Sequence, residues 1–253
     1  MKKIIGLVAV LVLLLPVMGR SGAISFRLAY VIPRAQSDLW AIEFENMSFQ
    51  KSDFQTTTLG LSYEHFLTRE LSVLIGVDSY TQTELGSYRD YVGFSFTDGD
   101  FAFPAADYTN GFSVDHNFSV SITPIQLSLK LAPLGRRSGL IPYIGGGVSL
   151  YIWTVKMLGD MVDFSDTSWV YDDPNLGEVQ IYPIFPIQAR AESRFNVGFH
   201  GFAGFMIPVA RQLAIEAEFK YSYGKGGLGS AFAGFEDFDL SGYQISLGAN
   251  YWF

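Results

Sequence analysis

Charged side chains occupy every second position from 216 to 220 in the segment 213–223, which reads LAIEAEFKYSY. Glu216, Glu218 and Lys220 share one face of this segment, and the opposite face is entirely apolar or aromatic. An alternation with period two is typical of a β-strand that lies between polar and apolar surroundings. Charges that point into a narrow interior must pair with opposite charges, because burial removes their hydration. The segment therefore predicts a network of buried ion pairs.

Other segments of about ten residues, the length that a tilted strand needs to cross a bilayer, show the same alternation. With 213–223, the predicted strands are 24–32, 56–66, 71–81, 118–131, 142–154, 195–207 and 243–253. Their polar faces add further members to the predicted network, namely Arg27, Glu64, Asp78, Lys130 and His200. We expect Glu216 and Glu218 to pair with the cations Lys130, Lys220 or Arg27. The role predicted for this network is structural.

One predicted strand departs from simple alternation. In 118–131 the phase of the apolar positions slips by one near Pro124. An extra residue in a strand produces such a slip, and proline is common at such irregularities. The slip therefore predicts a β-bulge at Pro124.

The connections between the predicted strands alternate in length. Residues 67–70, 133–140 and 208–212 form short turns, whereas 33–55, 82–117, 155–194 and 224–239 form long loops. Short turns at one end and long loops at the other are typical of transmembrane β-barrels. The sequence thus predicts an all-β fold, an eight-stranded antiparallel up-and-down transmembrane β-barrel. A soluble lipocalin-like barrel is the alternative, with the apolar faces inside.

The segment 183–190 (PIFPIQAR) is apolar enough to be a further strand. Its two prolines each remove a donor from the hydrogen-bond ladder, which argues against a membrane-spanning strand. We therefore predict a loop here. Within this loop, the neighbouring strands can extend beyond the bilayer. A barrel of ten strands is the alternative.

Catalytic chemistry has little support in the sequence. The histidines are His65, His116 and His200, and none lies in a pattern that combines a nucleophile, a base and an orienting group. The glycine run 145–147 is not followed by the Lys-Ser/Thr pair of a phosphate-binding loop. The chain has no cysteine, which excludes a disulfide framework and thiolate chemistry. We expect no enzymatic activity, no metal site and no cofactor.

The first 23 residues have the order of a secretory signal. Two lysines precede the apolar run 4–18, and small residues follow at Ser21 and Ala23. This order predicts a signal peptide over 1–23, cleaved after Ala23, and a single β-barrel domain over 24–253. The formal net charge is −8, so the chain lacks the basic surface of a nucleic-acid-binding protein.

Three stretches of the chain resemble the small outer-membrane β-barrels of the OmpA, OmpX and OmpW type. They are the hairpin 123–130 with 142–148, the penultimate strand 213–224, and the terminal Tyr251-Trp252-Phe253. The resemblance implies export to the bacterial cell outer membrane, with both chain ends in the periplasm. It also implies that Tyr251 and Phe253 form an assembly signal read by the barrel-assembly machinery. Outer-membrane lipid and lipopolysaccharide are the implied surroundings.

The long loops carry most of the acidic residues and several aromatic ones. The aromatic residues that we expect to be exposed there are Trp40, Phe101, Phe103, Trp169 and Tyr171. Two functions follow from these features. The first is a structural or surface-interaction role, with a polar, plugged lumen and an extracellular ligand bound through the acidic loops. The alternative is a narrow channel for ions or small solutes.

Overall fold

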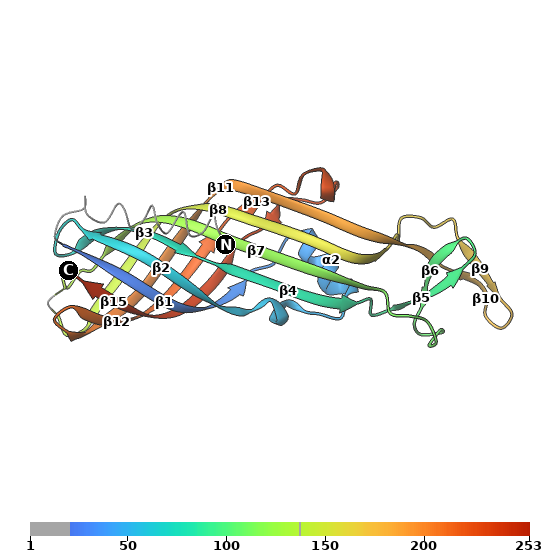
Figure 1. Cartoon of the computed structure of the whole chain (residues 1–253), viewed down its shortest axis with the longest axis horizontal. Helices are drawn as coiled ribbons and strands as arrows, with labels where there is room; N and C mark the ends of the chain where they lie inside the picture. Colours follow the sequence, from blue (N-terminus) through green and yellow to red (C-terminus); the bar gives the residue numbers. More distant parts are fainter. Residues whose placement is uncertain (1–20, 137) are drawn as a thin grey trace.

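The computed structural model describes residues 21–136 and 138–253, and eight barrel strands form a closed antiparallel sheet (Figure 1). In chain order they are β1 (Gly22–Pro33), β2 (Thr56–Phe66), β3 (Leu71–Asp78) continued by β4 (Tyr80–Ser87), β7 (Asp115–Leu131), β8 (Ile141–Val162), β11 (Tyr182–Ala210), β12 (Leu213–Tyr223) and β15 (Gly242–Trp252). Each strand pairs with the next, and β15 pairs with β1 to close the barrel. The predicted eight-stranded, up-and-down barrel is confirmed. Most of the predicted signal peptide lies outside the described residues, and β1 begins at Gly22.

Barrel strands continue into the segments expected to be loops, by three residues in β7 and by many more in β8 and β11. β7 begins at Asp115, β8 runs to Val162, and β11 begins at Tyr182. The prediction of a loop over 183–190 is wrong, since this segment pairs with β8, and the strand extension expected there is found. Its prolines are tolerated because this part of β11 has only one long partner strand. A proline on an edge strand has no backbone N–H to donate, but no second neighbouring strand is there to need that hydrogen bond.

The predicted bulge at Pro124 is also wrong. The pairing of β7 with β8 runs through Pro124 without a shift, from Thr123 opposite Ile152 to Ile125 opposite Leu150. Even-numbered side chains of β7 point inward along the whole strand. What changes at Pro124 is the polarity of the two faces.

On β7, the inward residues from Phe118 to Ile122 are apolar, and those after Pro124 are polar. The apolar ones are Phe118, Val120 and Ile122, and the polar ones are Gln126, Ser128 and Lys130. The outward face shows the opposite order, with Ser119, Ser121 and Thr123 followed by Leu127, Leu129 and Leu131. A strand that passes from lipid into water inverts its faces in this way, because the apolar side must turn inward once water surrounds the barrel. The inversion accounts for the apparent phase slip.

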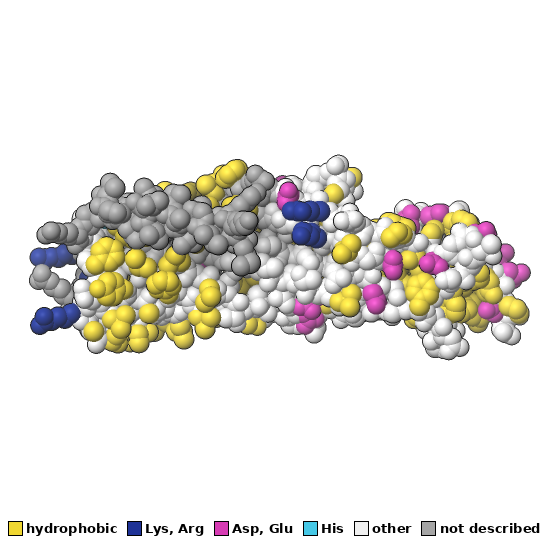
Figure 2. Space-filling view, viewed as in Figure 1, with side chains coloured by type: hydrophobic (Ala, Val, Ile, Leu, Met, Phe, Trp, Pro, Cys, Tyr) yellow, Lys and Arg dark blue, Asp and Glu magenta, His cyan; other side chains and the backbone are white. Residues whose placement is uncertain are grey.

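The outward apolar residues form a band around the end of the barrel that holds the short turns. Figure 2 shows this band at one end of the long axis and acidic side chains toward the other end. The side chains in the band are strongly exposed: Phe26 is 65% exposed, Leu59 72%, Val197 62% and Leu247 63%. We call this part of the molecule the banded half and the remainder the outer half.

The outer half is filled by an apolar core inside the barrel. The connection after β1 contains the helix α2 (Asp38–Asn46) and the 3-10 turn η1 (Lys51–Phe54). The connection before β15 adds β13 (Lys225–Gly226), η2 (Gly229–Phe232) and β14 (Phe238–Asp239). Trp40 of α2 packs against Phe54, Phe118 and Phe238, with ring centroids 5.0 to 5.2 Å apart. These segments therefore fold back into the barrel instead of extending into solvent.

The far end of the outer half carries two hairpins, visible beyond α2 in Figure 1. Their strands are β5 (Tyr91–Phe96), β6 (Gly99–Pro104), β9 (Val170–Asp173) and β10 (Gly177–Gln180). We call them the distal tip. Phe101 and Phe103 lie at the centre of its small apolar core.

The expectation that the loop aromatics are exposed is therefore wrong for three of them. Trp40 is 1% exposed, Phe101 4% and Phe103 2%. Trp169, by contrast, is 38% exposed, and Tyr171 is half-buried against the core of the distal tip. No α-helix within residues 21–136 and 138–253 is long and apolar enough to cross a membrane.

Candidate functional site in the barrel lumen

All the charged residues predicted to line the lumen point inward in the banded half and are buried. They are Arg27, Glu64, Asp78, Lys130, Glu216, Glu218 and Lys220, with His200 beside them, and none is more than 6% exposed. Alternation places them on the inner faces of β1, β2, β3, β7, β11 and β12. A lumen filled with water would leave such side chains accessible. Their burial shows that side chains pack across the lumen at this level.

Nearest the short turns, Glu64 of β2 binds two cations. Lys130 Nζ lies 3.0 Å from one carboxylate oxygen, and Arg136 Nη2 lies 2.9 Å from the other. The hydroxyl of Ser72 also donates to Glu64 at 2.5 Å. Lys130 lies over the ring of Tyr143, 4.0 Å from its centroid, which adds a cation–π contact. The carboxylate thus has partners on three sides.

Arg136 is a member of this group that the sequence does not reveal. It lies in the turn between β7 and β8, outside any alternating segment. Its guanidinium donates to the backbone oxygens of Thr68 and Arg69 at 2.9 and 2.8 Å and lies 4.0 Å over the ring of Phe66. The turn therefore folds back over the mouth of the barrel. Only tertiary structure brings this arginine to Glu64.

Deeper in the lumen, Asp78 of β3 is the centre of a second group. Lys220 Nζ lies 2.7 Å from Asp78 Oδ2 and 2.9 Å from the side-chain oxygen of Gln126. Arg27 lies between Asp78 and Glu218, at 3.8 and 3.7 Å. Glu218 thus pairs with Arg27, one of the cations predicted for it.

Glu216 does not make the predicted ion pair. In the part of the chain that the structure describes, no cation lies within 4.0 Å of its carboxylate. Its contact is with the Tyr143 hydroxyl at 3.5 Å, and the same hydroxyl lies 3.2 Å from Glu218. Of the two carboxylates, Arg27 pairs with Glu218 alone. The partner of Glu216 is therefore the neutral hydroxyl of Tyr143.

His200 is held between two serine hydroxyls. Ser128 Oγ lies 2.7 Å from Nε2, and Ser149 Oγ lies 2.8 Å from Nδ1. A hydrolytic site needs a carboxylate or similar group to orient the imidazole and a path for substrate. Here both ring nitrogens face hydroxyls, and the imidazole is 6% exposed. The arrangement is a packed hydrogen-bonded group in the lumen wall.

The other two histidines lie apart from the lumen network. His116, on the inner face of β7, binds Glu43 of α2 through Nε2 at 2.8 Å, and both side chains are buried. His65 lies near the end of β2 that joins the short turn. Within the described residues, no group of three or more histidine, aspartate or glutamate side chains is arranged to hold a metal ion.

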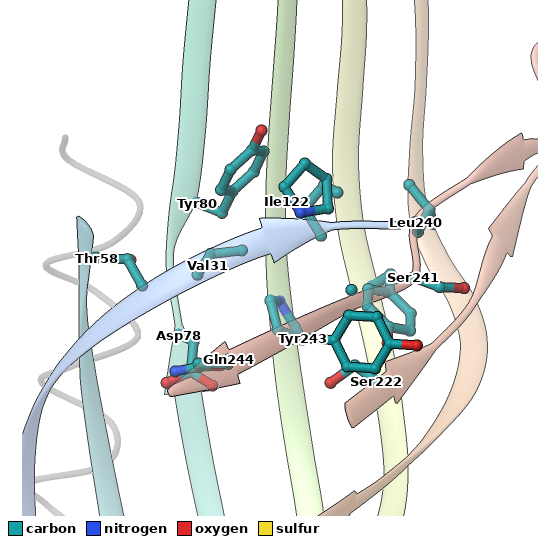
Figure 3. Close-up of a pocket in the computed structure, with 14 residues that line it drawn as sticks. Val31, Thr58, Asp78, Tyr80, Ile122, Ser222, Leu240, Ser241, Tyr243 and Gln244 are labelled. Carbon is teal, nitrogen blue, oxygen red and sulfur yellow. The ribbon is translucent and has the colours of Figure 1, made fainter. Parts of the chain in front are cut away.

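A small cavity separates the charged network from the apolar core above it. Its volume is about 60 Å³, enough for a few water molecules. Figure 3 shows Asp78, Gln244 and Thr58 on one side of it and Tyr80, Ile122 and Leu240 on another. Among the described residues, Thr58 Oγ1 and Gln244 Nε2 have no hydrogen-bond partner. The cavity is thus polar at one wall and apolar at the other.

Another space in the lumen is much smaller. It lies within the charged network, against Arg27, Gln126 and Lys220, and its volume is about 10 Å³. A single water molecule needs about this much. Charged side chains and aromatic rings thus occupy successive levels of the same lumen.

The two residues of the predicted assembly signal lie on or beside the last strand. Tyr251 and Phe253 point outward and are 49% and 41% exposed. The backbone of Phe253 pairs with Gly22 in both directions, at 3.0 and 3.1 Å. Their rings lie in the apolar band at the end of the barrel with the short turns.

No protein-family model matches the chain, and its sequence matches no curated protein. Among solved structures, it is similar to the outer membrane protein OprG from Pseudomonas aeruginosa, with 13% sequence identity, a TM-score of 0.49, and coverage of 93% of this chain and 97% of that one. OprG is an outer-membrane protein, the kind of protein that the sequence resembles. Neisserial surface protein A gives 12% identity and a TM-score of 0.46, with 91% of this chain and 96% of that one covered. The Escherichia coli outer membrane protein W has 14% sequence identity to this chain and a TM-score of 0.35. The match covers 93% of this chain and 100% of that one. These similarities concern the fold alone. The barrel is assigned from the strand pairing described above.

Proposed function

We propose that this protein is an outer-membrane β-barrel whose closed lumen makes it an anchor for a folded extracellular structure. The observation that carries the proposal is the inversion of face polarity along one continuous strand, as at Pro124 of β7. Below this level the barrel offers apolar side chains to lipid, and above it offers hydroxyls to water. A wholly soluble barrel needs apolar residues inside at every level and has no use for the exposed band.

The packed lumen supports an anchor over a channel. An eight-stranded barrel is just wide enough for its own side chains to fill. Here the ion pairs of Asp78 and Glu64 fill the banded half, and Trp40, Phe118 and Trp153 fill the outer half, each at most 1% exposed. A solute would have to displace both levels. The channel is therefore the less favoured function.

The distal tip is the part of the outer half best suited to meet a ligand. It exposes apolar side chains at its end, with Phe96 44%, Val170 53% and Leu176 54% exposed, beside Trp169. Asp98, Asp166 and Asp172 lie in the same hairpins and turns. Monomeric proteins rarely gather exposed apolar residues at one place without a use for them. We infer that the tip binds a partner that offers both apolar and basic groups.

Two measurements test this function separately. Fractionation of cells with heat-modifiable gel migration tests the placement, and recovery in the cytoplasm or the periplasm would contradict it. The variant F96S/W169S/L176S tests the tip by adhesion of expressing cells to a host-cell or matrix surface. The control I42S/L85S changes apolar residues that are similarly exposed elsewhere in the outer half. We expect adhesion to fall in the tip variant alone, and equal adhesion of both variants would contradict a ligand-binding tip.

A further inference from the structure

A row of polar side chains crosses the outer surface of four neighbouring strands just beyond the apolar band. The pairing registers place them directly opposite one another from β4 to β11, in the order Thr83, Ser119, Lys156 and Arg190. Lys156 and Arg190 are both exposed on this surface. The row therefore ends in two adjacent cations.

A second polar row lies beside the first on the side of the band. It contains Thr81, Ser121, Thr154 and Glu192. Hydroxyls bond across the strands in both rows, Thr83 with Ser119 at 2.8 Å and Thr81 with Ser121 at 2.9 Å. Each hydroxyl keeps further donor or acceptor capacity for a ligand. Together with Lys156 they line a shallow groove of about 310 Å³, which is within the range of small-molecule sites.

The protein neutralises only one of the two cations. Like charges directly opposite on a sheet repel and destabilise the pairing. Glu192 contacts Arg190 and offsets one positive charge, and no acidic side chain among the described residues forms an ion pair with Lys156. An anion held between Lys156 and Arg190 would remove the repulsion and accept hydrogen bonds from both.

The height of this groove indicates where the anion belongs. On β8, Ile152 is the last outward apolar residue before the polar rows, and Lys156 lies four residues beyond it. At about 3.3 Å per residue this is roughly 13 Å along the strand, and less along the axis of a tilted barrel. Figure 2 shows basic side chains just beyond the apolar band. That level corresponds to the headgroups of the outer leaflet.

We propose that Lys156 and Arg190, with the hydroxyl rows beside them, bind the phosphorylated sugar headgroup of an outer-leaflet glycolipid. Paired cations suit a phosphate group, and a ladder of hydroxyls suits the hydroxyls of a sugar. The acyl chains of the same lipid would lie along Ile152 and Leu150. The site is on the side of the barrel, away from the distal tip, so a lipid fits it better than a soluble polyanion. This inference rests on the outer-membrane placement proposed above.

The test measures binding of lipid A to the full chain in detergent micelles by native mass spectrometry. We expect K156Q/R190Q to bind bisphosphorylated lipid A roughly tenfold more weakly than the wild type, since charge-assisted hydrogen bonds are lost. Dephosphorylated lipid A should bind both proteins equally. K156R/R190K should keep most of the affinity, and K51Q/K225Q, which removes two other exposed cations, should leave it unchanged.

Equal affinity of the wild type and K156Q/R190Q for bisphosphorylated lipid A would overturn the proposal. Inorganic phosphate that displaces the lipid at equal concentration would overturn the lipid as the source of the anion. Folding of each variant is checked by heat-modifiable migration, and Thr154→Val is a second, uncharged variant expected to weaken the same binding. Fractionation of the wild type reports on the outer-membrane placement independently of these affinities.

Discussion

Lys130 Nζ lies 3.0 Å from Glu64 Oε2, and both side chains are only 2% exposed. A buried ion pair contributes little net stability over an apolar pair of the same shape, because both ions lose their hydration. Removing one partner is a different matter, since it leaves an uncompensated charge. The pair therefore fixes how the lumen packs, and its members depend on each other.

We predict that Lys130→Met destabilises the barrel by about 3 kcal/mol, the usual result of breaking a buried pair. Arg136 still binds Glu64 in this variant and limits the loss. Adding Glu64→Gln should restore part of the stability, because the buried carboxylate that has lost Lys130 is then neutral, whereas Arg136, which is 11% exposed, keeps some contact with water. Unfolding in urea of the protein in micelles measures both effects. A double variant that is no more stable than Lys130→Met would contradict the coupling.

The glycines of β8 give a second prediction. A Cβ at position 147 would lie 1.9 Å from the backbone oxygen of Leu127, so the adjacent strand would have to move. Gly147→Ala should destabilise the barrel by about 1–3 kcal/mol, as overpacking generally does. Gly201→Ala is the matched control on β11, where the nearest atom would be 3.9 Å away. Thermal unfolding compares the two, and equal melting temperatures would contradict this packing.

The strands and the inward charges could be predicted because they depend on a period of two, which any strand with unlike faces must show. The number of strands and the network members on the strands follow from that pattern, whereas the choice of Arg27 as the partner of Glu218 among three candidate cations does not. The partner of Glu216 could not be predicted either. Alternation shows on which face of a strand a residue lies, but it does not show at what height in the barrel the residue lies. Arg136 was missed since turns have no period.

The outer half was harder to predict for a physical reason. Where a barrel strand enters water, its apolar positions move from odd to even residues without any change in pairing, as at Pro124. The broken pattern in the sequence then predicts a bulge at Pro124, although the pairing there is regular. Trp40 shows the same limit, because its burial depends on α2 folding back against Phe118, a contact between distant segments.

The distal tip should loosen in acid. The backbone N–H of Asn175 donates to Asp173 and lowers the pKa of that carboxyl, and the Tyr108 hydroxyl and the Leu176 N–H add to the effect. Because the folded pKa is below the ordinary value of about 3.9, this stabilisation is present at neutral pH. It is lost as the pH falls through the folded pKa.

Amide hydrogen exchange at Asn175 measures this dependence. We expect protection at neutral pH that falls off below about pH 4, near the ordinary pKa of an aspartate. Asp173→Asn should remove most of the dependence at Asn175. Asp166, whose pKa is lowered by bonds from Ser168, provides the internal control, because the Ser168 amide should still respond to pH in this variant. Unaltered pH dependence at Asn175 in Asp173→Asn would argue against this role.

Phe253 gives a prediction on assembly. The Phe253→Ala variant keeps the backbone pairing with Gly22 and removes a ring that is 41% exposed. The yield of assembled barrel in the outer membrane should fall severalfold, whereas the melting temperature of refolded protein should change little. Tyr243→Ala is the control, since this ring on β15 is also 41% exposed. Equal yields from the two variants would refute an assembly signal at Phe253.

The central claim is that the lumen is closed by ion pairs in the banded half and by aromatic side chains in the outer half. Single-channel recording of the purified wild-type protein in planar bilayers tests it most directly, with insertion verified by flotation of protein-containing vesicles. The account predicts no current above the lipid baseline at either polarity. Reproducible, discrete conductance steps from the inserted protein would contradict it and favour the narrow channel.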